Sequence, residues 1–129
     1  MILHPLRTTN FFLALIIFAL ASCATVGAPT ANKLAGKWRS AQGRQTAEYL
    51  FLTDGTFTGR VISNGALVSD FAGSWSLRAG TILYEYRSDR LGRIAVGTLD
   101  RDKLLAVADD YYLIEAADGS RRKYLRITN

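Results

Sequence analysis

From residue 36 onward, the chain is a series of short runs in which apolar and polar residues alternate, with turn signals between the runs. Alternation with a period of two is typical of strands that bury one face of a sheet. The pairs Asp54-Gly55 and Asn64-Gly65 favour tight hairpins, and turn signals recur about every ten residues. We therefore predict an all-β fold, a small antiparallel meander that closes as a barrel or packs as a sandwich, with about eight to nine strands and short helices at most. The predicted strands are 36–40, 46–52, 56–62, 70–77, 81–87, 91–99, 104–108, 111–116 and 121–127.

The N-terminal segment is typical of an export signal. Arg7 is followed by an apolar run over 11–20, and the next charged residue is Lys33. A membrane-spanning helix needs roughly 20 apolar residues, and the strongly apolar part of this segment is shorter than that. Small residues follow it, where a peptidase needs access. The pattern predicts a helical signal peptide that is cleaved.

The sole cysteine of the chain stands directly behind this run, in the sequence Leu20-Ala21-Ser22-Cys23. This sequence resembles the lipobox of bacterial lipoproteins. The resemblance implies cleavage before Cys23, a diacylglyceryl thioether on its sulfur and usually a further acyl chain on the new amino terminus. Two or more chains anchor a protein stably to a membrane. The alternatives are an uncleaved anchor and a free thiol, while an intramolecular disulfide needs a second cysteine.

These observations predict three segments: the signal peptide (1–22), the lipidated cysteine with a flexible tether (23–33), and one β-domain (34–129). The tether contains Gly27 and Pro29 and has no apolar stripe to bury. In enteric lipoproteins an aspartate after the cysteine favours the inner membrane, and this chain has Ala24 there. The expected location is therefore the cell envelope, at the outer membrane if the host has two membranes.

Removal of the signal peptide restricts the chemistry that remains. The sole histidine, His4, leaves with it, and Cys23 is occupied by lipid. Ser/His/Asp and Cys/His catalysis, histidine-bound zinc and thiolate metal clusters are then excluded. We predict a non-catalytic protein with no cofactor and no metal. A carboxylate-based hydrolase is the remaining enzymatic alternative.

Two Gly-x-Trp motifs, Gly36-Lys37-Trp38 and Gly73-Ser74-Trp75, flank the hairpin segment 51–57. Together these features are similar to small bacterial lipocalin-like domains over residues 34–127. The resemblance implies that Trp38 lies at the closed end of a barrel under a basic side chain of the last strand, which here is Arg126. Stacking of a guanidinium on an indole contributes about 0.5 to 2 kcal/mol. The chain is shorter than the larger lipocalins and lacks their C-terminal helix.

Charged residues gather near several predicted turns. The basic groups suit anionic lipid headgroups, lipopolysaccharide or an acidic glycan, or else form solvated rims. The acidic residues suggest a calcium site or a carboxylate pair for glycoside hydrolysis, but turn formation is the favoured interpretation, including a turn over 100–103. Nucleic acid is a poor partner for an exported protein. The basic residues are Arg87, Arg90, Arg93, Arg121, Arg122 and Lys123, and the acidic ones are Asp100, Asp102, Asp109 and Asp110.

The aromatic side chains fall largely on alternating strand positions, so they either fill the barrel or line a cavity in it. Our main hypothesis is an envelope lipoprotein that binds a small apolar ligand or an envelope component. The alternative is a filled-core interaction or structural module that contacts a protein, an anionic lipid or a glycan. The sequence does not specify an oligomeric state. The candidate ligand-binding residues are Trp75, Tyr84, Tyr86 and Tyr112.

Overall fold

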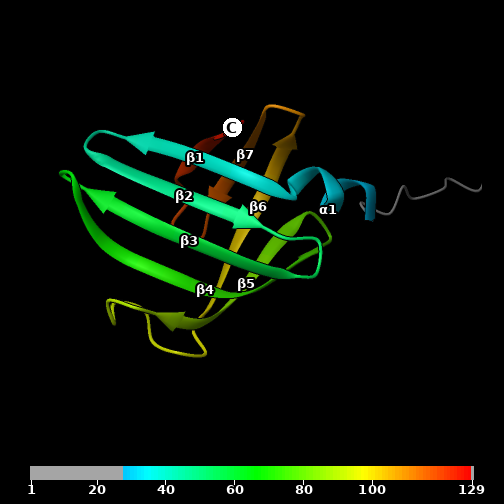
Figure 1. The fold of residues 1–129 in the computed structure, drawn as a ribbon. Helices are drawn as coiled ribbons and strands as arrows, with labels where there is room; N and C mark the ends of the chain where they lie inside the picture. Colours follow the sequence, from blue (N-terminus) through cyan, green and yellow to red (C-terminus); the bar gives the residue numbers. More distant parts are fainter. Residues whose placement is uncertain (1–27, 129) are drawn as a thin grey trace, which may run out of the picture.

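The computed structural model describes residues 28–128, which form a short helix followed by eight strands (Figure 1). The strands follow one another as an antiparallel meander, and β8 also pairs with β1, so the sheet closes into a barrel. The predicted all-β antiparallel barrel is confirmed. The predicted signal peptide and Cys23 lie outside the described residues. The elements are α1 (Ala28–Leu34), β1 (Gly36–Gln42), β2 (Gln45–Phe51), β3 (Thr56–Ser63), β4 (Ala66–Arg78), β5 (Thr81–Asp89), β6 (Leu99–Val107), β7 (Tyr111–Ala116) and β8 (Arg121–Arg126).

The meander gives the barrel two different ends. Helix α1, the C-terminal end of β8 and the β2–β3, β4–β5 and β6–β7 turns share one end, which we call the closed end. The β1–β2 and β3–β4 turns lie at the opposite end (Figure 1), together with the β5–β6 loop (90–98) and the β7–β8 turn. We call this opposite end the open end.

The prediction of a strand over 91–99 and a turn over 100–103 is wrong. Residues 90–98 form a loop, and 100–103 lie inside β6, where Thr81 pairs with Lys103. The Asp89 carboxylate accepts hydrogen bonds from the backbone N–H groups of Leu91, Arg93 and Ile94, which removes these donors from strand pairing. The pairing of β6 with β5 and β7 overrides the turn preference of the polar residues 100–103.

The predicted flexible tether also differs from the structure, because its C-terminal part belongs to α1. A helix this short is not stable by itself. Its last residue, Leu34, is fully buried, and the Leu34 carbonyl accepts a hydrogen bond of 2.8 Å from Trp38 Nε1. Contacts with the closed end therefore stabilise the helix.

The half of the barrel next to the closed end is filled with large side chains. The largest fully buried ones are Trp38, Tyr112, Phe51, Phe57, Leu34, Ile82 and Ile114. Two inward-facing glycines make room for this packing. A Cβ at Gly59 would clash with the ring of Phe71, and a Cβ at Gly73 would clash with the Glu85 carbonyl oxygen. Gly73 also stands at the register shift between β4 and β5. Close packing of rings and strands thus depends on the absence of side chains at these two positions.

The contact predicted between Trp38 and Arg126 is present. The guanidinium carbon of Arg126 lies 4.1 Å from the centroid of the Trp38 ring. Its Nη1 donates to the Ala35 carbonyl at 2.9 Å, its Nη2 donates to the Lys33 carbonyl at 2.8 Å, and its Nε donates to the Asp109 carbonyl. One side chain thus joins α1, β1, β8 and the β6–β7 turn.

The substitution Arg126→Ala should lower the free energy of unfolding by about 2 to 4 kcal/mol, because it removes the cation–π contact and three hydrogen bonds to carbonyls. Urea denaturation followed by tryptophan fluorescence measures this change. Arg121→Ala, on the exposed face of the same strand, is the matched control and should change the stability by no more than about 0.5 kcal/mol. Equal losses for the two variants would contradict the role of Arg126 at the closed end.

Candidate functional site

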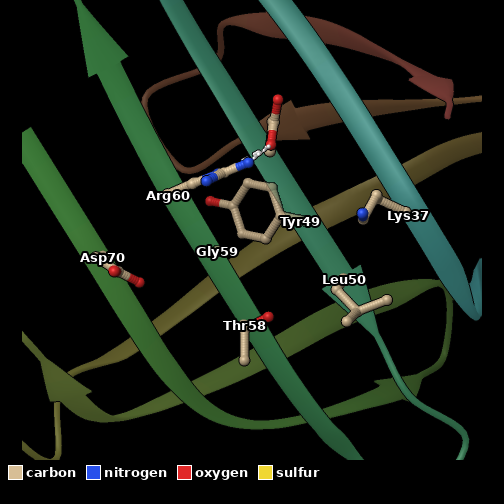
Figure 2. A pocket seen from close by; sticks show the side chains of 8 residues that line it. Lys37, Tyr49, Leu50, Thr58, Gly59, Arg60 and Asp70 are labelled. Atoms are coloured by element: carbon tan, nitrogen blue, oxygen red, sulfur yellow. Dashed lines mark hydrogen bonds and ion pairs between the residues drawn. The ribbon is translucent and has the colours of Figure 1, made fainter. Parts of the chain in front are cut away.

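A groove of about 370 Å³ runs along the outer face of β1 to β4 (Figure 2). Lys37 on β1 and Asp70 on β4 stand at its sides, and Leu50 and Thr58 lie between them. At its centre Glu48 binds two arginines: Oε1 accepts from Arg39 Nε and Nη2 at 3.0 and 2.8 Å, and Oε2 accepts from Arg60 Nε and Nη2 at 3.0 and 2.9 Å.

These ion pairs explain the chemistry of the groove. Partial desolvation raises the pKa of Glu48, but the hydrogen bonds and charges of Arg39 and Arg60 outweigh it and lower the pKa. Asp70 is paired with Arg90, with 2.6 Å between Oδ2 and Nη2. Arg39, Glu48 and Arg60 thus form a cross-strand ladder over β1, β2 and β3 that supports the sheet, and the second carboxylate of the groove is engaged by an arginine of the β5–β6 loop.

The second candidate site is a hollow of about 320 Å³ at the open end of the barrel. Its lining is mainly apolar and comes from strands β2 to β5 and from the β5–β6 loop. Aromatic rings form its floor, aliphatic side chains form its wall, and two polar side chains lie at its edge. The lining residues are Tyr49, Phe71 and Tyr86, then Val61, Val68 and Ile94, then Ser69 and Arg93.

Of the four candidate ligand-binding residues, the structure places Tyr86 at this hollow. Tyr84 is buried, and its hydroxyl donates to Asp102 Oδ2 at 3.0 Å. Tyr112 stacks on Tyr124 with 4.7 Å between ring centroids, and Trp75 Nε1 donates to the Leu52 carbonyl at 3.0 Å. Tyr112 and Trp75 therefore belong to the packed interior.

The sequence interpretation missed most of the hollow's lining. Val61 and Tyr49 carry a signal that was available, since both share the inward face of their strands with Phe57 and Phe51. Ile94 carries no such signal, because it lies in a loop whose path is set by Asp89.

Asp89 organises the loop that borders the hollow. Its carboxylate accepts five hydrogen bonds, from Ser69 Oγ and from the backbone N–H groups of Asp70, Leu91, Arg93 and Ile94. Desolvation acts to raise the pKa of Asp89, but these hydrogen bonds outweigh it and lower the pKa to about 2. The loop therefore has a fixed shape that depends on an ionised carboxylate.

Across the barrel from the aliphatic wall, the interior carries charged groups. Arg122 on β8 is half-buried between exposed Arg121 and Lys123, so it faces inward and does not belong to the basic rim for which it was a candidate. It borders a recess of about 10 Å³. Asp102 on β6 also faces inward, and burial raises its pKa, although the hydrogen bond from Tyr84 acts in the opposite direction.

The predicted acidic and basic groups are dispersed by the fold. Asp109 and Asp110 lie in the β6–β7 turn at the closed end, where their carbonyls accept hydrogen bonds from Arg126. Glu85 is exposed on the outer face of β5. Within residues 28–128, no three acidic, histidine or cysteine side chains are grouped so that they would hold a metal ion.

The part of the chain that the structure describes contains no helix with the length and apolar character needed to cross a membrane.

The fold and the hollow together define an eight-stranded antiparallel barrel that is closed at one end and hollow at the other. Such a barrel is lipocalin-like: the chain is similar to the crystal structure of a lipocalin-like protein from Bacteroides uniformis ATCC 8492, with a TM-score of 0.53 and 21% sequence identity. The match covers 74% of this chain and 99% of that chain. No protein-family model and no curated protein sequence matches the chain. The similarity establishes the fold.

The substitution Asp89→Asn should loosen the β5–β6 loop, because an amide presents donor hydrogens to the N–H groups that the carboxylate binds. Hydrogen exchange of the Leu91, Arg93 and Ile94 amides should become faster. The folded-state pKa lies below the unfolded value of about 3.9, so the stabilisation by Asp89 is present above about pH 4 and is lost as the pH falls toward 2. This acid-dependent loss should be smaller in the variant.

Asp118→Asn is the control, since Asp118 lies in an exposed turn at the same end and hydrogen-bonds only to Ser120 among the described residues. It should leave exchange in the β5–β6 loop unchanged. Retained protection of the loop amides in Asp89→Asn would show that the carboxylate does not organise the loop.

Proposed function

We propose that this protein is a non-catalytic, lipid-anchored protein of the cell envelope that binds a small apolar or amphipathic ligand at the open end of its barrel. The observation that carries the binding role is the hollow of about 320 Å³ with its floor of aromatic rings and its aliphatic wall. Its volume is at the lower end of ordinary ligand sites, which suits one small molecule. The lipocalin-like fold supports the same role, since barrels of this size hold a small ligand within the sheet.

The interior of the barrel supports binding of one small molecule better than storage of a large one. The closed half is occupied by packed rings such as Trp38, Phe51 and Tyr112, each nearly without exposed surface. A ligand therefore enters from the open end and stops on the rings of Tyr49, Phe71 and Tyr86. Their edges and faces provide an apolar contact surface.

The alternative, an interaction module with a filled core, is favoured by a different observation. Val96 and Leu99 are 77% and 75% exposed near the open end. Exposed aliphatic side chains in the β5–β6 loop and at the first residue of β6 suit contact with a partner. A protein that binds no small molecule would favour this alternative.

Binding should be tested on the full-length chain in lipid nanodiscs, first by native mass spectrometry for a copurifying small molecule and then by titration with a fluorescent fatty acid. Val61→Trp places a large ring in the hollow and should weaken binding by about tenfold or more, a loss of about 1.4 kcal/mol. Thr58→Trp is the matched control because it lies on the same strand but faces the outer groove. It should bind as the wild type does.

Two results would reject the site: an empty wild-type protein that fails to bind the probe, or loss of binding in Thr58→Trp and not in Val61→Trp. Circular dichroism of each variant shows whether the barrel is intact.

The anchor is proposed from Leu20-Ala21-Ser22-Cys23. Cys23→Ala should abolish metabolic labelling with palmitate and leave an uncleaved precursor, because the sulfur that carries the lipid is gone. Ser22→Ala keeps a small residue before the cysteine and should still be labelled. Normal maturation and labelling of Cys23→Ala would contradict the anchor.

The proposed location is the outer membrane in a host that has two membranes, on the basis of Ala24 after the cysteine. Fractionation of the two membranes, with Ala24→Asp as the comparison, tests it. The wild type should accompany the outer membrane and Ala24→Asp the inner one.

A further inference from the structure

The open half of the barrel has two unlike walls. Val61, Phe71 and Ile94 make one side apolar. Asp102 on β6 and Arg122 on β8 make the other side charged. The ring of Tyr49 lies between the two sides, with its centroid 5.6 Å from that of Phe71 and 5.6 Å from that of Tyr124. The interior is therefore amphipathic, with an apolar side and a charged side and the Tyr49 ring between them.

Arg122 is incompletely satisfied in this position. Its Nε is buried and has no hydrogen-bond partner among the residues that the structure describes. A buried donor without a partner costs about 1 to 3 kcal/mol. This side chain faces the interior while its neighbours Arg121 and Lys123 are exposed, so the fold turns one of three consecutive basic side chains inward.

Asp102 offers a hydrogen-bond acceptor where Arg122 offers a donor. Tyr84 donates to its Oδ2, and the carboxyl group is half-buried on the inward face of β6. The register of β6, β7 and β8 places Asp102 opposite Ala116 and places Arg122 opposite Ile114, two residues along the same inward face of β7. Arg122 and Asp102 are nevertheless not within the 4.0 Å that defines an ion pair. An acid and a base thus face the interior from two strands that flank β7, two residues apart along that strand and without direct contact.

We propose that this polar wall binds the head group of an amphipathic ligand, and that the head group is a neutral amide whose carbonyl oxygen accepts a hydrogen bond from Arg122 and whose N–H donates to Asp102. The apolar chain of the ligand lies in the hollow along Val61, Phe71 and Ile94. The inference rests on the proposed binding function and specifies the chemistry of its ligand.

The charges of the wall select against simpler head groups. A carboxylate would gain Arg122 but would meet Asp102 and also Asp100, which precedes it by two residues on the same strand face. An ammonium group would gain the two carboxyl groups but would meet Arg122 and, at the edge of the hollow, Arg93. A group with one acceptor and one donor satisfies both side chains without a like charge at either.

The test compares octanamide, octanoate and octylamine, which share one chain and differ in the head group, by displacement of the fluorescent fatty acid from the full-length protein. The wild type should bind octanamide most tightly, by about tenfold over the two ions. Asp102→Asn should shift the preference toward octanoate, and Arg122→Gln should shift it toward octylamine. Arg121→Gln and Lys103→Gln, the exposed neighbours on the same strands, should leave the order of affinities unchanged.

Arg122→Lys and Asp102→Glu keep the charges and should keep the wild-type order, which guards against a variant that fails to fold. The wild-type order decides by itself: octanoate or octylamine binding as tightly as octanamide would overturn the proposal. If all three ligands bind equally and Val61→Trp removes them, the head-group inference fails and the binding function stands. If none binds, both fail.

Discussion

The barrel depends on how its first and last strands are joined. The register of β1 with β8 contains two residue pairs, Trp38 with Arg126 and Arg39 with Leu125, whereas β1 and β2 pair over their whole length. A seam this short supplies few backbone hydrogen bonds, and the Arg126 side chain adds what the backbone lacks. Its guanidinium lies on the Trp38 ring and donates to carbonyls of α1, of the α1–β1 junction and of the β6–β7 turn. Closure of the sheet and attachment of the helix are therefore one interaction.

Inside the barrel, large packed rings at the closed end give way to smaller side chains toward the open end. Trp38 contacts Tyr112 edge-on, with 4.8 Å between ring centroids. From this pair, contacts between rings continue toward the open end through Tyr124 to Tyr49. Between Tyr49 and the open end, the inward positions of β2 and β3 carry smaller side chains, Ala47 and Val61. The hollow lies where the rings end, and the loop ordered by Asp89 borders it. A rigid closed end thus supports an open end of fixed shape.

The sequence predicts the parts of this structure that local patterns determine. Tight turns such as Asp54-Gly55 located the strands up to residue 87, and the Gly-x-Trp motif led to Trp38 and its partner on the last strand. The failures lie between residues 88 and 108, where one carboxylate accepts hydrogen bonds from three backbone N–H groups of the loop that follows it. That interaction depends on the three-dimensional position of Asp89, which alternation of residue types does not reveal. The inward direction of Arg122 was accessible, because it shares a strand face with Tyr124.

The same kinds of charged residue are used in opposite ways on the two faces of the sheet. On the outer face each oxygen of Glu48 accepts two hydrogen bonds from an arginine. The central carboxylate of the groove is therefore already satisfied by these hydrogen bonds. On the inner face, among residues 28–128, Arg122 keeps a buried nitrogen without a partner and Asp102 forms no ion pair. Water can satisfy charged groups on the outside at little cost, while an unpaired group inside remains costly. A cost of this kind is typical of sites that recognise ligands. It is the reason to propose the interior of the open end, rather than the larger outer groove, as the ligand site.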